Sequence, residues 1–62
     1  SKETERKYTL ALKTTERLED LLTLAITFID TLVSKMTAEE LTPPPMPQKL
    51  TDWVAERNHK ES

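Results

Sequence analysis

The stretch from residue 14 to residue 36, TTERLEDLLTLAITFIDTLVSKM, decides the fold of this chain. Six of its apolar residues are spaced 4, 3, 4, 3 and 4 positions apart: Leu18, Leu22, Ala25, Ile29, Leu32 and Met36. This is the a/d rhythm of a heptad repeat, and it predicts one apolar stripe along a helix. A strand separates polar from apolar residues less well, because alternation would place Asp30 on the same face as Leu22 and Phe28. We therefore interpret the stretch as helical.

The apolar face of this helix is wider than the stripe alone. Leu21 and Phe28 flank the stripe on one side, and Ile26 and Val33 flank it on the other. A face of this width exceeds the seam of a two-stranded coiled coil and suits a helix with two or more neighbours, as in a bundle.

The first 13 residues allow two interpretations. Tyr8, Leu10 and Leu12 alternate with polar or small residues, which is typical of a half-buried strand. However, neither glycine nor proline interrupts the chain before Met36, and this favours one long helix over about residues 3–36. Such a helix would span about 50 Å at ~1.5 Å per residue. We favour residues 1–36 as one amphipathic helix and keep a separate arm or strand at 1–13 as the alternative.

A connector is expected at residues 37–47. Thr37 and Glu40 have the spacing of a capping box, which predicts a short helical turn beginning at Thr37. Thr42 precedes a proline and is therefore disfavoured in a helix. The run from Pro43 to Pro47 predicts a stiff polyproline II segment.

A second, shorter helix is expected at about residues 48–60, within a C-terminal segment 48–62 that ends in a polar tail. Leu50, Trp53 and Val54 form its narrow apolar patch. A helix this short is unstable alone in water, so we expect it to pack on the first helix. Trp53 should then contact Phe28, Ile29 or Leu32.

Composition indicates that the chain needs a partner. The 62 residues include 9 Lys+Arg and 11 Asp+Glu, giving a net charge of −2, and there is no cysteine. The core of so small a chain supplies only about 3–5 kcal/mol, and neither disulfides nor a zinc cluster can add to it. We therefore expect an all-α helical hairpin that assembles into a multi-helix bundle. The favoured assembly is a homodimer, with higher states or another helical protein as alternatives. The expected interface residues are Leu18, Leu21, Leu22, Ala25, Phe28, Ile29, Leu32, Val33, Met36, Leu50, Trp53 and Val54.

The residue types present argue against an enzyme. His59 is the only imidazole, and neighbouring carboxylates such as Glu19 and Asp20 point about 100° apart on a helix. No glycine-rich loop exists to hold a phosphate, because the chain contains no glycine. We therefore predict no catalytic residue, no metal site, no cofactor and no small-molecule substrate. The favoured function is a non-enzymatic oligomerisation or protein–protein interaction module, or a small regulator.

Two other functions are weaker alternatives. A dimeric nucleic-acid-associated regulator would use the basic residues of the N-terminal segment, which are Lys2, Arg6, Lys7 and Lys13. The acidic balance of the whole chain makes a nucleic-acid partner the less favoured one. A peptide ligand for a polyproline-binding domain would use Pro43, Pro44, Pro45 and Pro47, among which Pro44 and Pro47 have P-x-x-P spacing.

The hydropathy pattern predicts no membrane span. The apolar run from Leu21 to Val33 is shorter than the roughly 20 residues that a bilayer requires, and Asp30 interrupts it. A long polar segment precedes the run, unlike in a secretory signal. Together with the absence of cysteine, this favours an intracellular location, cytoplasmic or nuclear. No motif in the chain is specific enough to identify a family.

Overall fold

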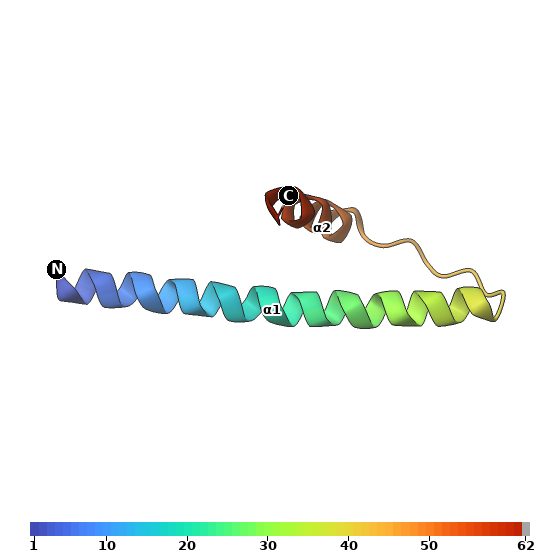
Figure 1. Ribbon diagram of the computed structural model, residues 1–62, viewed down its shortest axis with the longest axis horizontal. Helices are drawn as coiled ribbons and strands as arrows, with labels where there is room; N and C mark the ends of the chain where they lie inside the picture. The colour runs from blue at the N-terminus through green and yellow to red at the C-terminus, as the bar shows by residue number, and fades with distance from the viewer. Residues whose placement is uncertain (62) are drawn as a thin grey trace.

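The computed structural model describes residues 1–61, which form two helices, α1 (Lys2–Ala38) and α2 (Gln48–Glu61) (Figure 1). No strand occurs among these described residues, so the all-α prediction is confirmed and the strand alternative for residues 1–13 is wrong. A half-buried strand needs neighbouring strands to pair with, and nothing in residues 1–61 supplies one.

The first turn of α1 carries the features of a helix start. The Ser1 hydroxyl accepts a hydrogen bond from the Thr4 backbone N–H at 3.3 Å. Glu3 and Glu5 lie in the first turn, where carboxylates stabilise the positive end of the helix dipole. The helix therefore begins directly after Ser1 and includes the alternating residues 8–12.

The hydroxyl groups of several threonines on α1 are hydrogen-bonded within the helix. Five of them donate to the backbone carbonyl four residues earlier, at 2.8–3.0 Å: Thr15, Thr23, Thr27, Thr31 and Thr37. Thr23, Thr27 and Thr31 form a continuous row, because residues four apart share one side of a helix.

α1 ends later than expected, and the capping-box prediction is wrong. Thr37 is still helical, and the helix continues to Ala38. Leu41 N–H then donates to the Met36 carbonyl at 2.8 Å, and Glu40 N–H donates to the Thr37 carbonyl at 3.0 Å. This pair of bonds is the Schellman motif, in which one residue adopts the left-handed conformation. Here Glu40 does so, with φ of 62°, at a position that usually favours glycine.

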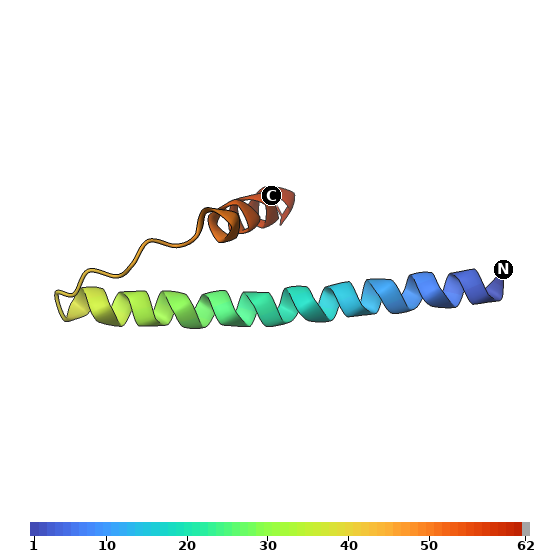
Figure 2. The same ribbon diagram turned by 180° about the vertical axis from the view of Figure 1, so that it is seen from behind.

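The connector, residues 39–47, leads back along α1, so that α2 lies beside the middle of the long helix (Figures 1 and 2). α2 starts immediately after Pro47, whose carbonyl accepts hydrogen bonds from the N–H groups of Leu50 and Thr51. Proline suits this position, because a helix that begins at the next residue does not need the N–H that proline lacks. The polyproline II conformation of the connector stays a prediction.

The single chain is elongated, with extents of 58 × 19 × 19 Å and a radius of gyration of 16.6 Å. A compact chain of this length would have a radius of gyration of about 10.6 Å. Among the described residues, no two Cα atoms twelve or more positions apart lie within 8 Å of each other. Side chains alone therefore bridge the two helices, and the expected multi-helix bundle stays a prediction.

Candidate interaction surfaces

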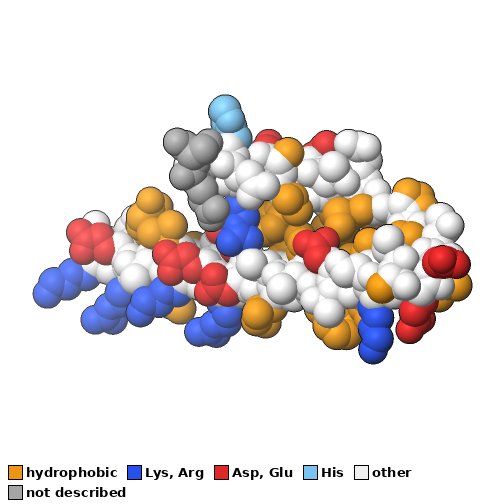
Figure 3. Space-filling model, turned by 45° about the vertical axis from the view of Figure 1, so that its right-hand side comes forward, with side chains coloured by type: hydrophobic (Ala, Val, Ile, Leu, Met, Phe, Trp, Pro, Cys, Tyr) orange, Lys and Arg blue, Asp and Glu red, His pale blue; other side chains and the backbone are white. Residues whose placement is uncertain are grey.

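One side of α1 faces α2 and the connector, and we call it the seam. Its residues are spaced 4, 3, 4 and 3 apart: Leu22, Ile26, Ile29, Val33 and Met36. Ile26 is the most buried, with 9% of its surface exposed, and the others are half-buried. Figure 3 shows hydrophobic side chains filling the space between the helices.

The connector contributes to one end of the seam. A mainly apolar groove is lined by Ile29, Asp30 and Val33 of α1, Leu50 of α2 and the run from Pro43 to Pro47. Pro43 and Met46 are half-buried there. The other three prolines of the predicted ligand segment are exposed, namely Pro44, Pro45 and Pro47.

The opposite end of the seam is polar. The Thr23 hydroxyl accepts a hydrogen bond from the Arg57 guanidinium and donates its own hydrogen to the Glu19 carbonyl at 2.8 Å. The Arg57 guanidinium also lies over the Trp53 ring, 5.6 Å from its centroid. This contact fixes α2 against α1 at a point 34 residues back along the chain.

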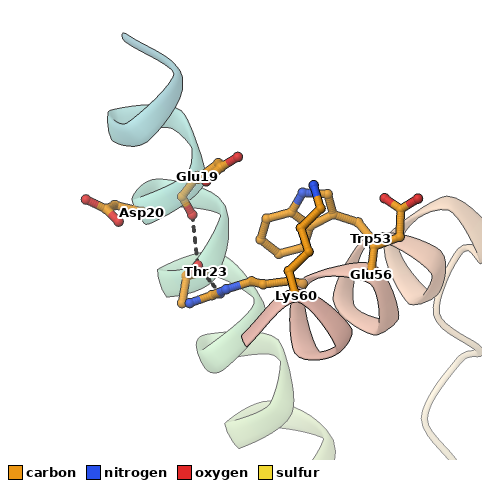
Figure 4. Close-up of a pocket in the computed structure, with 7 residues that line it drawn as sticks. Glu19, Asp20, Thr23, Trp53, Glu56 and Lys60 are labelled. Atoms are coloured by element: carbon orange, nitrogen blue, oxygen red, sulfur yellow. Dashed lines mark hydrogen bonds between the residues drawn. The ribbon is translucent and has the colours of Figure 1, made fainter. Parts of the chain in front are cut away.

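A cleft opens at this polar end (Figure 4). Its lining residues are Glu19, Asp20, Thr23, Trp53, Glu56, Arg57 and Lys60. Trp53 lines this cleft together with Thr23 of α1. Its expected contact with Phe28, Ile29 or Leu32 stays a prediction. Within residues 1–61, no group of three or more His, Cys, Asp or Glu side chains is placed to hold a metal ion.

A second apolar surface on α1 has no neighbour within the described chain, and we call it the open face. Its residues are spaced 3, 4, 3 and 4 apart: Leu18, Leu21, Ala25, Phe28 and Leu32. The four large side chains are 61%, 57%, 64% and 46% exposed, respectively. The open face lies roughly a quarter of a turn around α1 from the seam. Figure 3 shows hydrophobic side chains on the side of α1 directed away from α2.

The expected interface residues thus divide between two surfaces. Seven of them are half-buried: Leu22, Ile29, Val33 and Met36 in the seam, and Leu50, Trp53 and Val54 on α2. The other five form the open face. Ile26 was not among the expected residues, although it is the most buried in the chain, because it flanks the stripe that we took as central. The width of the apolar face was the signal that could have identified it.

The four basic residues that we considered for phosphate contact are all exposed on the first part of α1. Lys2, Arg6 and Lys13 share one side of the helix, because they are spaced 4 and 7 residues apart. Lys7 instead lies in line with the open face. Glu5 shares a shallow groove with Lys2 and Arg6, so this basic side also carries a carboxylate.

α1 also meets the length and composition criteria for a helix that could cross a membrane. The sequence argued against a span because Asp30 and several threonines interrupt the apolar run. A core helix of a soluble protein and a signal sequence meet the same criteria.

Comparisons with protein-family models, with curated proteins and with solved structures find no match to this chain. The function proposed below therefore follows from the surfaces of the chain alone.

Proposed function

We propose that this protein is a non-enzymatic self-association module, in which two copies cover the open face of α1 against each other. The observation that supports this is the open face itself, whose large side chains stay 46–64% exposed in heptad spacing. Soluble chains rarely leave a contiguous apolar patch of this kind uncovered, because its contact with water is unfavourable.

The accessible surface of the chain supports the same proposal. The chain exposes 5899 Å² at a mass of 7.2 kDa. A folded monomer of this mass would expose about 4,100 Å². The excess of roughly 1,800 Å² is larger than the ~800 Å² that each partner buries in a standard protein interface. Each chain therefore has enough excess accessible surface to form an interface of standard size with a second copy.

The positions of the two surfaces suit a bundle of four helices. Each α1 would have its own α2 on the seam and the α1 of the other copy on the open face. Because the two surfaces are roughly a quarter of a turn apart, the neighbours do not collide. This is the arrangement that a helix has at one corner of a four-helix bundle.

Sedimentation equilibrium of the intact chain, from low micromolar to millimolar concentration, tests the proposal. We expect the mass to rise from 7.2 kDa towards twice that value. A mass that stays at 7.2 kDa in a sample that is fully helical and melts cooperatively would contradict the proposal. So would complete partition into zwitterionic lipid vesicles, because the open face would then be covered by lipid.

A further inference from the structure

We propose that the two copies pair their α1 helices antiparallel, with the two-fold axis beside residue 23. The occupant of the open face is therefore a second copy of this chain in one stated orientation and register. This inference rests on the proposed self-association and adds to it the direction and alignment of the helices.

The charge along α1 supports the antiparallel direction. Residues 1–17 carry five basic and three acidic side chains, so 5 − 3 = +2, whereas residues 18–40 carry one basic and five acidic, so 1 − 5 = −4. Figure 3 shows basic side chains interspersed with acidic ones along the N-terminal part of α1, and acidic side chains together with a basic one near the turn. Parallel pairing brings like charges together along the whole length. Antiparallel pairing places the basic end of each copy on the acidic end of the other.

The heptad spacing of the open face continues beyond its five residues. The continuous series is Lys7, Ala11, Thr14, Leu18, Leu21, Ala25, Phe28, Leu32, Lys35 and Glu39. Parallel helices in register pair each of these residues with itself, so that Lys7 would face Lys7 and Lys35 would face Lys35. Burying two like charges against each other is unfavourable, so the lysines at both ends disfavour this arrangement.

An antiparallel pair avoids this conflict when the numbers of facing residues add up to 46. Leu18 then meets Phe28, which pairs two large apolar side chains, and Leu21 meets Ala25, which pairs a large side chain with a small one. At each end Lys7 meets Glu39, an oppositely charged residue. Lys35 meets Ala11, whose small side chain leaves the ammonium access to water.

The neighbouring registers are less favourable. Shifting one helix by seven residues in one direction places Lys35 against Leu18, and shifting it in the other direction places Lys7 against Leu32. Each shift therefore sets a charged side chain against a leucine, twice in a symmetric dimer. Of these three registers, only the one with the axis beside residue 23 keeps both lysines away from leucines.

The same register covers the part of α1 that α2 does not reach. Figure 1 shows the N-terminal part of α1 extending beyond α2. In the antiparallel dimer, residues 8–17 of this part lie along residues 29–38 of the partner's α1. The part of α1 that is too long to be covered by its own α2 is thus covered by the α1 of the other copy.

Disulfide cross-linking of the full chain tests the orientation, because the chain has no native cysteine. The variants Ala11→Cys and Lys35→Cys change two exposed residues in the same antiparallel layer. We expect an equimolar mixture to oxidise to a dimer containing one chain of each kind, while each variant alone cross-links at least tenfold more slowly. Thr27→Cys, on the opposite side of α1, is the control and should not cross-link.

The outcomes separate the two proposals. Efficient cross-linking of each variant with itself would show parallel helices and overturn this inference, while self-association would stand. A wild-type mass of two chains without mixed cross-linking would overturn the register. A monomer by sedimentation would overturn the proposed function as well.

Charge reversal provides a second measurement that does not depend on disulfide geometry. Lys7→Glu and Glu39→Lys should each raise the dimer dissociation constant, roughly two- to thirtyfold for two symmetric exposed pairs. The double variant should restore the wild-type value, and high salt should reduce all differences. A double variant that dimerises no better than either single variant would refute the pairing of these residues.

Discussion

Replacing Leu21 with glutamine should dissociate the proposed dimer without unfolding the single chain. Leu21 lies in the open face, next to the proposed two-fold axis, and 57% of its surface is exposed, so it adds little to the contact between α1 and α2. Glutamine and leucine have similar helix propensities, so α1 should remain helical. The change therefore acts mainly on the surface that we propose to be buried between copies.

The size of the effect follows from the exposed fraction of Leu21. Fully burying a leucine side chain contributes about 1.5–3 kcal/mol. Because 57% of Leu21 is still exposed, covering the remainder contributes about 0.9–1.7 kcal/mol per copy. A symmetric dimer loses this contribution twice, or about 2–3 kcal/mol. The dissociation constant should therefore rise roughly 30- to 150-fold.

Sedimentation equilibrium measures this change, and circular dichroism at the same concentrations monitors the helix. Leu12→Gln is a matched control, because Leu12 is 46% exposed and lies nine residues away, on the opposite side of α1. The control should leave the dissociation constant within about threefold of wild type. If the two variants weaken the dimer equally, or if Leu21→Gln has no effect, our assignment of the open face is incorrect.

Three further variants test the single chain at low concentration. Ile26→Ala should lower the free energy of unfolding by about 2 kcal/mol, at the low end for core isoleucines, and shift the tryptophan fluorescence to the red as the seam opens. Glu40→Gly should raise the free energy of unfolding by about 0.5–1 kcal/mol, measured by urea melts at high salt, because glycine tolerates the left-handed conformation. A lower urea midpoint would contradict this prediction. Thr23→Val removes the acceptor for Arg57 and should cost about 0.5–1.5 kcal/mol, whereas Thr27→Val, which removes only a hydroxyl bonded within α1, should cost less. Equal effects of the two threonine changes would show that the Arg57 contact contributes nothing.

The helical class of the chain was predictable, because its signals are local. The apolar spacing between Leu18 and Met36 repeats with a helical period, and no glycine or proline breaks it. Pro43 to Pro47 marks the place where helix must stop and a second one can begin. These features depend on neighbouring residues only, so the sequence contains them directly.

The division of the apolar face into two surfaces was not predictable from spacing alone. Two series of residues with heptad spacing run side by side on α1, one through Ile26 and one through Phe28. The series that we took as central takes members from both. Which series meets α2 depends on the path of the connector and on where Trp53 and Arg57 contact α1. These are long-range properties, and periodicity within α1 does not report them.

The end of α1 was mispredicted for a different reason. Thr37 and Glu40 fit a capping box, but the same residues also fit the last turn of an existing helix. Continuing α1 costs little, because each added residue gains a backbone hydrogen bond, whereas a new helix needs a new nucleus. With Pro43 close by, no room is left for that nucleus, and the Schellman motif satisfies the final carbonyls instead.

The threonine row has a consequence for how much of the α1 surface must stay hydrated. Its hydroxyls already donate their hydrogens to carbonyls within the helix, as the bonds of Thr23, Thr27 and Thr31 show. Dehydrating such a hydroxyl forfeits little hydrogen bonding to water, whereas dehydrating an ionised carboxylate forfeits a great deal. Between residues 21 and 34 the only ionised side chain is that of Asp30. Between residues 21 and 34, only the Asp30 carboxylate must stay hydrated. The rest of this side of the helix can lose its water at little cost.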